Sequence, residues 1–272
     1  MRAPPPTGEV LMEPEAIDPT RPAPARIYDY FLGGKDNYEA DRAVAEQLLK
    51  LDPEVARAVR ENRRFLGEAV RHLVQEEGVR QFLDIGAGLP TQDNVHQVAH
   101  RHAPDARVVY VDNDPMVLAH GRALLDGGST TILRADLRDP GEILAHPEVT
   151  KVIDFTEPVA ILLVAVLHFL PDEQDPEAVV ATLRDALPPG GFLVLTHGTA
   201  DGVDGKMEQA TEAYRPASSQ LALRSRQQVE PFFGDLEMLE PGLTWIQDWW
   251  PPGPVVPSAR KGLYAGVARK NA

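Results

Sequence analysis

The sequence predicts an α/β fold in which a doubly wound, mostly parallel sheet carries helices on both faces. Two observations support this prediction. From about Arg80 onward, short apolar runs alternate with longer amphipathic ones, a pattern typical of repeated strand–helix units. After the fifth apolar run the rhythm changes, and a late pair of strand-like segments favours an antiparallel strand at the edge of the sheet.

Five apolar runs are the strand candidates of the parallel part. They are RQFLDIG (80–86), RVVYVD (107–112), TTILRAD (130–136), VAILLVAVL (159–167) and GFLVLTH (191–197). Amphipathic stretches between these runs predict helices over 93–103, 115–125, 140–146 and 175–187. The Pro-Pro-Gly-Gly stretch at 188–191 ends the last of these helices before the fifth strand begins.

Further helical patterns flank this core. Segments 40–52 and 54–78 precede the first strand, whereas 206–233 predicts helical segments that lead to strand candidates at 243–250 and 261–270. Seven prolines before Arg26 predict an extended tail over residues 1–25. We therefore expect a single domain over 26–272, in which the helical part up to about residue 78 forms a lid.

Composition excludes several classes of protein. The chain holds 41 acidic and 27 basic residues, and its net charge of −14 disfavours nucleic acid and anionic membrane surfaces as partners. It has no cysteine, and its eight histidines show no metal-ligand spacing, so we expect no metal site. Neither a signal peptide nor an apolar run of about 18 residues is present, so we expect a cytoplasmic location.

The stretch FLDIGAGLPT (82–91) combines a buried strand, an acid and two glycines at a strand-to-helix turn. Gly86 and Gly88 would let the backbone approach a ligand closely, although a tight turn without a ligand is the alternative. Asp84 would repel a pyrophosphate but attract an ammonium group. Pro90 and the residue after it replace the third glycine of a dinucleotide fingerprint. The stretch therefore favours a zwitterionic nucleoside over NAD, and disfavours an NAD-dependent oxidoreductase.

Two more acids end the next two strands. Asp112 follows Asp84 by 28 residues and could accept hydrogen bonds from both hydroxyls of an adenosine ribose. Asp136 could accept from the adenine amino group, with the backbone N–H of Leu137 near a ring nitrogen. Asn113 is either a helix cap or a ligand contact. One acid after a strand often forms only a turn, but three acids on successive strands indicate a binding site.

These stretches resemble a known set of motifs. DIGAG (84–88), YVDNDP (110–115), RADL (134–137) and LPPGGFLVLTH (187–197) resemble the ordered motifs of class I S-adenosylmethionine-dependent methyltransferases. ARIYDYFLGGKDNYEADR (25–42) is similar to the N-terminal signature of a bacterial methyltransferase-like family first catalogued as a domain of unknown function. The resemblance implies a seven-stranded Rossmann-like sheet with one antiparallel strand. It also implies S-adenosylmethionine as the cofactor, bound at the turn Gly86, Ala87 and Gly88.

Gly33 and Gly34 interrupt the helical pattern of residues 25–42, and two interpretations compete. They could form a kink between packed helices, or a lid whose backbone presses against the cofactor. In folds of this kind the helices before the first strand often cover the cofactor, so we expect Gly34 and the ring of Tyr28 to contact it. The carboxylate of the cofactor needs a cation, for which the candidates are Arg26, Lys35 and Arg63.

Methyl transfer depends on alignment of donor and acceptor, and a base helps only where the acceptor carries a proton. His168 and His197, at the ends of the fourth and fifth strands, are the candidate catalytic bases; helix packing or capping is their alternative role. No Asn-Pro-Pro-aromatic stretch follows the fourth strand, which disfavours nucleobase and glutamine acceptors. We therefore expect a methyltransferase for a small molecule. The alternative is a protein that binds S-adenosylmethionine or S-adenosylhomocysteine without transfer activity.

Overall fold

The computed structural model describes residues 17–90, 93–124, 128–199, 201–202, 207–251, 253–254 and 262–271. Thr91 and most of the expected tail (1–25) lie outside these ranges. Residues 17–25 are described, and they belong to the folded body. Ala23 is buried, and its backbone N–H donates to the Asp41 carboxylate over 2.9 Å. The folded part therefore begins before residue 26.

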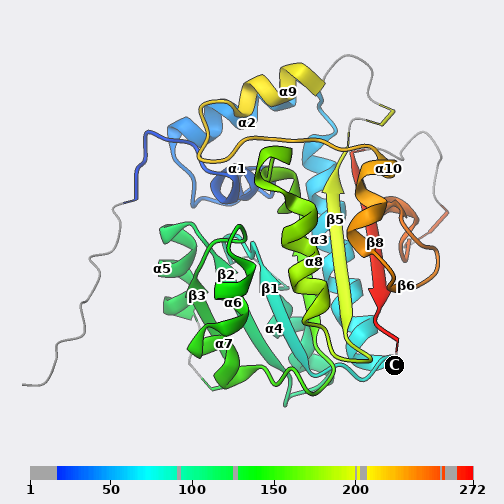
Figure 1. Cartoon of the computed structure of the whole chain (residues 1–272). Coiled ribbons are helices and arrows are strands. Elements are labelled where there is room, and N and C mark those ends of the chain that lie inside the picture. The colour runs from blue at the N-terminus through cyan, green and yellow to red at the C-terminus, as the bar shows by residue number, and fades with distance from the viewer. Residues whose placement is uncertain are drawn as a thin grey trace, which may run out of the picture.

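A central sheet of eight strands organises the described part of the chain (Figure 1). The strands are β1 Gln81–Ile85, β2 Arg107–Asp112, β3 Thr130–Arg134, β4 Ala160–Val164, β5 Phe192–Gly198, β6 Glu237–Met238, β7 Thr244–Trp245 and β8 Leu263–Arg269. Their order is β3-β2-β1-β4-β5-β8-β6, with β7 also paired to β8. The first five strands pair in parallel, and β8 runs antiparallel to β5, β6 and β7. The predicted doubly wound, mostly parallel sheet is confirmed.

Helices cover both faces and the upper edge of this sheet (Figure 1). Their bounds are α1 Pro24–Phe31, α2 Glu39–Leu51, α3 Val55–Gln75, α4 Val95–His102, α5 Pro115–Leu124, α6 Pro140–Ala145, α7 Pro147–Val152, α8 Pro176–Asp185, α9 Met207–Tyr214 and α10 Arg226–Val229. Side chains of α6, α7 and α8 share one apolar cluster with the sheet, and those of α3 and α4 share another. Helices α1, α2 and α9 pack together above the carboxyl ends of the parallel strands.

Local sequence explains where these helices begin and which face they bury. On α3 the buried residues recur at three- and four-residue spacing, as in Phe65, Ala69 and Leu73, which gives one apolar stripe. Helix α8 starts where the Asp175 carboxylate accepts from the Ala178 backbone N–H over 3.1 Å, with a proline in the first position. Caps and stripes of this kind can be recognised in the sequence.

The last strands differ from the sequence prediction. Within 243–250 only Thr244–Trp245 is a strand, and a 3₁₀ turn over Ile246–Asp248 follows it. The turn brings the indole of Trp249 into the core, where it is fully buried against Phe65 and donates to the Ala265 carbonyl over 2.9 Å. Burial of this large ring outweighs continued strand pairing. The two-residue strand β6 is too short to show an alternating pattern.

The glycine pair at 33–34 ends helix α1. Gly33 has a φ of +80°, and its N–H donates to the Tyr30 carbonyl, while the N–H of Gly34 donates to the Asp29 carbonyl. This is the Schellman arrangement of a helix C-terminus. A Cβ on Gly34 would overlap the buried Asp29 carboxylate, which accepts from the Asp36 N–H and the Asn37 amide. The end of helix α1 therefore explains why glycines occupy both positions.

We expect Gly34→Ala to lower the melting temperature by several degrees, because the added Cβ displaces the Asp29 carboxylate from its two donors. Gly67→Ala is the matched control, since apart from the adjoining residues and the backbone of α3 nothing lies within 4 Å of a Cβ at that position. Alanine is favoured over glycine in a helix interior by about 1 kcal/mol, so this variant should gain stability. Thermal unfolding by circular dichroism measures both, and an unchanged melting temperature for Gly34→Ala would contradict the packing argument.

Candidate functional site

A cleft of about 810 Å³ lies at the carboxyl ends of β1 to β4. Its volume is within the range of roughly 300–1,000 Å³ found for small-molecule sites. The chain order of the strands reverses between β1 and β4, and open α/β sheets bind their ligands at such a reversal. The loops after these strands form the floor. Residues 17–28 form a roof, and 169–174 together with 218–220 form the far wall.

The turn after β1 is held open by its two glycines. Gly86 has a φ of +76°, and a Cβ there would overlap the side chain of Val166. Gly88 has a φ of +68°, and no atom lies within 4 Å of the place where its Cβ would be. Gly86 therefore lets another part of the protein approach, whereas Gly88, like Ala87, leaves backbone exposed at the cleft.

Asp112, at the end of β2, fixes two loops of the floor. One carboxylate oxygen accepts from the Gly88 N–H over 2.8 Å, and the other accepts from the Asp114 N–H over 2.9 Å. Burial raises the pKa of Asp112 to about 6, against the opposing effect of these N–H donors. A carboxylate has lone pairs for about four donors, so Asp112 can still accept hydrogen bonds from a ligand.

Asp84, at the end of β1, is a buried acid whose carboxylate makes no hydrogen bond or ion pair with a described residue. Only 4% of the residue is exposed, yet it lines the cleft. Burial raises the pKa of Asp84 to about 7; the nearby Arg63 guanidinium opposes this rise, and the negative charge of Asp112 adds to it. The side-chain oxygens of Asp84 are not fully enclosed by the protein, so they still reach the cleft and can pair there with a cationic ligand.

The third acid lies after β3 and already has partners in the protein. Asp136 accepts from the Nε of Arg138 over 2.8 Å and from the Asn113 amide over 3.3 Å. The hydrogen bond from Arg138 lowers the pKa of Asp136 to about 2. Asp136, Asn113 and Leu137, which the sequence analysis offers as contacts to the cofactor, all line the cleft.

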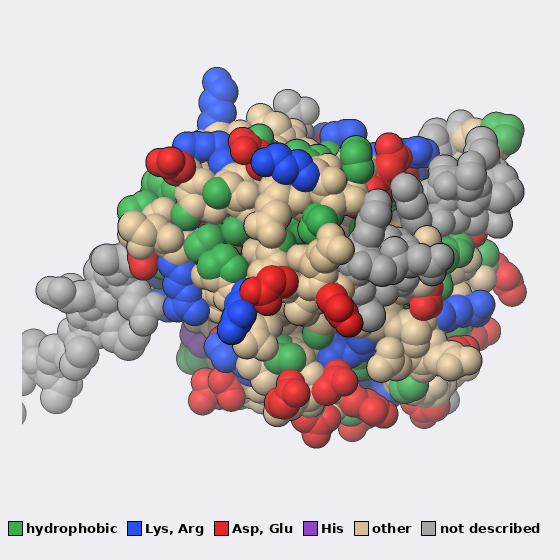
Figure 2. All heavy atoms as spheres, turned by 90° about the horizontal axis from the view of Figure 1, so that it is seen from above, with side chains coloured by type: hydrophobic (Ala, Val, Ile, Leu, Met, Phe, Trp, Pro, Cys, Tyr) green, Lys and Arg blue, Asp and Glu red, His purple; other side chains and the backbone are tan. Residues whose placement is uncertain are grey.

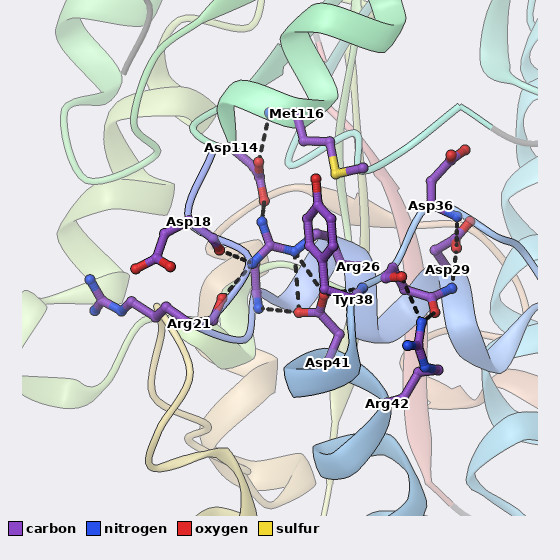
Figure 3. A network of polar contacts seen from close by, with 12 residues as sticks. Asp18, Arg21, Arg26, Asp29, Asp36, Tyr38, Asp41, Arg42, Asp114 and Met116 are labelled. Atoms are coloured by element: carbon purple, nitrogen blue, oxygen red, sulfur yellow. Dashed lines mark hydrogen bonds and ion pairs between the residues drawn. The ribbon is translucent and has the colours of Figure 1, made fainter. Parts of the chain in front are cut away.

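The roof is tied down by one buried arginine (Figure 3). Arg26 is only 4% exposed, and its Nε lies 3.0 Å from an Asp41 oxygen. Its Nη1 lies 3.9 Å from an oxygen of Asp114 on the floor, and its Nη2 donates to backbone carbonyls of Asp18 and Arg21. The charge of Arg26 is thus neutralised within the protein. Arg63 lines the cleft too, and its Nη2 donates to the Asp93 carbonyl over 3.4 Å.

Some residues predicted from the sequence lie elsewhere. Gly34 and Lys35 are not among the residues that line the cleft; they sit at the C-terminal end of α1. Their predicted contacts with the cofactor find no support in this placement. The alternative of a kink between helices is closer to the observed helix end.

His168 and His197 also lie outside the cleft lining. His168 accepts from the Gly198 N–H over 3.1 Å, and burial lowers its pKa to about 3. The fully buried His197 donates from Nδ1 to the Gly198 carbonyl over 2.7 Å and accepts at Nε2 from Arg224 over 3.0 Å. Burial also lowers the pKa of His197 far below its usual value. These surroundings match the packing role, so we leave both histidines out of the site proposed below.

Three site residues were missed by the sequence analysis. Asn62 and Ala165 line the cleft, and Thr196 lies directly behind them in a hydrogen-bonded chain. Asn62 could have been recognised from the sequence, because it is a polar residue within the apolar stripe of α3. Thr196 and Ala165 could not have been recognised in this way, since they form part of ordinary apolar strand patterns.

Among the described residues, every helix is too short or too polar to span a bilayer. No group of three or more His, Cys, Asp or Glu in the same residues could hold a metal ion.

Comparison with known proteins connects this geometry to a family. A family model described as S-adenosyl methyltransferase matches residues 11–271. A candidate methyltransferase from Thermobifida fusca is 44% identical, with a TM-score of 0.89, and the match covers 96% of this chain and 100% of the other. A DUF574 family protein from Streptomyces avermitilis is 39% identical, also with a TM-score of 0.89, over 94% and 100% of the two chains. No curated protein matches the chain.

The fold extends to more distant structures. A SAM-dependent methyltransferase from Anabaena variabilis is 16% identical with a TM-score of 0.51, and the match covers 75% of this chain and 84% of the other. This likeness concerns the fold alone.

The titration of Asp84 predicts how stability without ligand depends on pH. The pKa of Asp84 is about 7 in the folded protein, whereas an Asp in the unfolded chain has its ordinary pKa of about 3.8. The unfolded chain therefore ionises first as pH rises, and the folded state loses up to about 4 kcal/mol of stability between pH 4 and pH 7. Asp84→Asn cannot ionise, so its stability relative to the wild type should increase from pH 5 to pH 8 in thermal unfolding.

The matched control is Asp105→Asn, which removes a carboxylate that is 77% exposed and so is not desolvated by folding. The stability of this variant relative to the wild type should not follow the same trend. Equal pH trends in the two variants would contradict the role assigned to burial of Asp84.

Proposed function

The chain belongs to the S-adenosyl methyltransferase family, and we propose that its cleft holds S-adenosylmethionine while the methyl group passes to a small-molecule acceptor. The observation that carries the proposed site is the buried carboxylate of Asp84, which faces the cleft without a partner among the described residues. An ammonium group is the natural partner for such an acid. The methionine end of S-adenosylmethionine carries one.

The other residues of the floor fit the remaining parts of the cofactor. Asp112 has spare acceptor capacity for ribose hydroxyls, and it lies one strand further toward β3. Asp136, Leu137 and Asn113, after β3 and β2, would surround the adenine. Arg63 lies beside Asp84 and would face the cofactor carboxylate, a role for which the sequence also offered Lys35 and Arg26. Because Arg26 is bound to Asp41 and Lys35 lies outside the cleft lining, Arg63 is our choice.

When bound, S-adenosylmethionine supplies an electrophilic methyl group on a sulfonium, so the protein needs to align this group with the acceptor. Asp84 and Asp112 would fix the two ends that flank the sulfonium. Tyr28 presents its ring in the roof, where a sulfonium cation could lie against it. Residues 17–28 would also exclude water from the reacting centre. This chemistry needs neither His168 nor His197.

The shape and charge of the cleft support a small acceptor. The cleft is bounded by a roof and a far wall, which leaves room for a compact molecule beside the cofactor. Seen from above, basic and acidic side chains are interspersed with hydrophobic ones, and the described residues on this face form no broad basic patch (Figure 2). Together with the net charge of −14, this arrangement disfavours a polyanionic acceptor.

We expect S-adenosylmethionine and S-adenosylhomocysteine to bind with affinities that increase from pH 5.5 to pH 7. Asp84 must be ionised to hold the ammonium, and its pKa in the free protein is about 7. Below that pH each binding event should release a proton, which calorimetry in two buffers of different ionisation heat detects. Asp84→Asn should bind more weakly and lose most of the pH dependence and proton release near pH 7, and it should keep only the part that Asp112, with a pKa of about 6, contributes at lower pH.

Two results would contradict this proposal at different levels. No heat at millimolar cofactor with a folded protein would contradict binding itself. Binding that stays independent of pH in the wild type would contradict the role of Asp84 alone.

Asp112→Ala should weaken binding of S-adenosylhomocysteine by about 1.5–3 kcal/mol, since charge-assisted hydrogen bonds to the ribose are lost. The 2′-deoxy analogue of the same ligand separates this direct effect from loosening of the Gly88 loop. In the wild type the analogue should bind more weakly than the parent ligand, and in Asp112→Ala this difference should shrink. If the difference persists in the variant, Asp112 only supports the loop.

A further inference from the structure

A directed chain of buried hydrogen bonds links the end of β4 to the roof of the cleft. The N–H of Ala165 donates to the Thr196 hydroxyl over 2.8 Å, and this hydroxyl donates to the Asn62 side-chain oxygen over 2.7 Å. The Asn62 amide donates to the Tyr28 hydroxyl over 2.9 Å, which in turn donates to the Val59 carbonyl over 3.3 Å. The turn after β4, strand β5 and helices α3 and α1 are joined in this way.

The donors and acceptors of this chain fit together in one consistent direction. A backbone N–H can only donate, so Thr196 accepts from Ala165, and its own O–H is available to donate to the Asn62 oxygen. Asn62 then accepts at its oxygen and donates from its nitrogen to Tyr28. Thr196 is 0% exposed and Asn62 is 1% exposed, so water cannot replace a missing partner. A fully satisfied buried network of this kind holds its members rigidly.

Both ends of the chain reach the cleft. Tyr28 lines it from the roof, and Ala165 lines it together with Val164 and Val166. Ala165 has a φ of +58°, which is a strained backbone conformation for a residue with a Cβ. The hydrogen bond from Ala165 to Thr196 holds the chain in this turn.

This turn lies beside the part of the cleft where the sulfonium would bind under the proposed function. Strand β4 neighbours β1 on the side away from β2 and β3, which would hold the ribose and the adenine. Gly86, in the turn after β1, approaches the side chain of Val166 so closely that no Cβ would fit. If Asp84 on β1 holds the ammonium, the β1 turn and the residues that follow β4 would flank the sulfonium.

We propose that Asn62 and Thr196 are positioning residues for methyl transfer, and that they hold Tyr28 and the Ala165 turn around the sulfonium methyl group. The proposal rests on the proposed function, because it takes S-adenosylmethionine as the ligand. Neither Asn62 nor Thr196 needs to touch the reacting atoms. Their contribution is to fix the position of two groups that line the cleft.

The test compares S-adenosylmethionine with S-adenosylhomocysteine, which differ only in the methyl group and its positive charge. Thr196→Val keeps the shape of the side chain but breaks the chain of hydrogen bonds, and Thr196→Ser keeps the hydroxyl. In Thr196→Val we expect the dissociation constant of S-adenosylmethionine to rise at least fivefold more than that of S-adenosylhomocysteine. In Thr196→Ser the ratio of the two constants should stay within twofold of the wild type.

A purely structural role would lower the melting temperature and weaken both ligands equally, which would overturn the proposal. Thr130→Val is the matched control, since Thr130 is also a buried strand threonine but lies at the start of β3, away from the cleft. In Thr130→Val the ratio of the dissociation constants of S-adenosylmethionine and S-adenosylhomocysteine should equal that of the wild type. If Thr196→Val does not fold, Tyr28→Phe gives the same test by cutting the chain at its other end, and an unchanged ratio there overturns the proposal.

The outcome also separates this proposal from the proposed function. A wild-type protein that binds neither ligand would overturn both. Binding of both ligands by the wild type, with a ratio unmoved by Thr196→Val or Tyr28→Phe, would overturn only the positioning role.

Discussion

The carboxylate of Asp112 holds the two loops from which the cleft is built. One oxygen fixes the Gly88 turn after β1, and the other fixes Asp114 at the start of α5. Asp114 in turn faces Arg26, whose guanidinium is bound to Asp41 and so anchors the roof to helix α2. Floor and roof are thus connected through a short series of charged contacts, and the order of the strands places this series where the sheet opens. The glycines, the acids and the N-terminal helices are parts of one arrangement.

Asp84 lowers the stability of the ligand-free protein when it is ionised, at a position where the proposed function has it bind the cofactor. A carboxyl group buried without a partner raises the free energy of the folded state whenever it is ionised. The structure retains this group in the lining of the cleft, whereas Asp136, which follows a strand two positions away in the sheet, is already paired with Arg138. Groups that are unfavourable in the free protein and matched by the ligand are typical of binding sites. The strained turn at Ala165, one strand away, fits the same description.

Much of the fold and of the candidate site could be predicted from the sequence, because the signals are local. Apolar runs ending in Asp84, Asp112 and Asp136 mark parallel strands, and parallel strands bring their carboxyl ends to one edge. Other features depend on long-range contacts or on register. Thr196 meets Asn62 across 134 positions of the chain. His197, one residue further, faces the opposite layer, where its ring lies 6.0 Å from that of Phe232. A strand pattern places a residue at the correct edge without showing on which face of the sheet its side chain lies.

The most direct test of the account is the titration of Asp84 itself, followed by carboxyl-carbon NMR on protein labelled at aspartate, with Asp84→Asn to assign the signal. In the free protein the pKa of Asp84 should be about 7. With S-adenosylhomocysteine bound, the ammonium beside the carboxylate should lower that pKa to below about 5. A pKa of Asp84 that stays the same in the complex would show that the ammonium binds elsewhere and would contradict the proposed site.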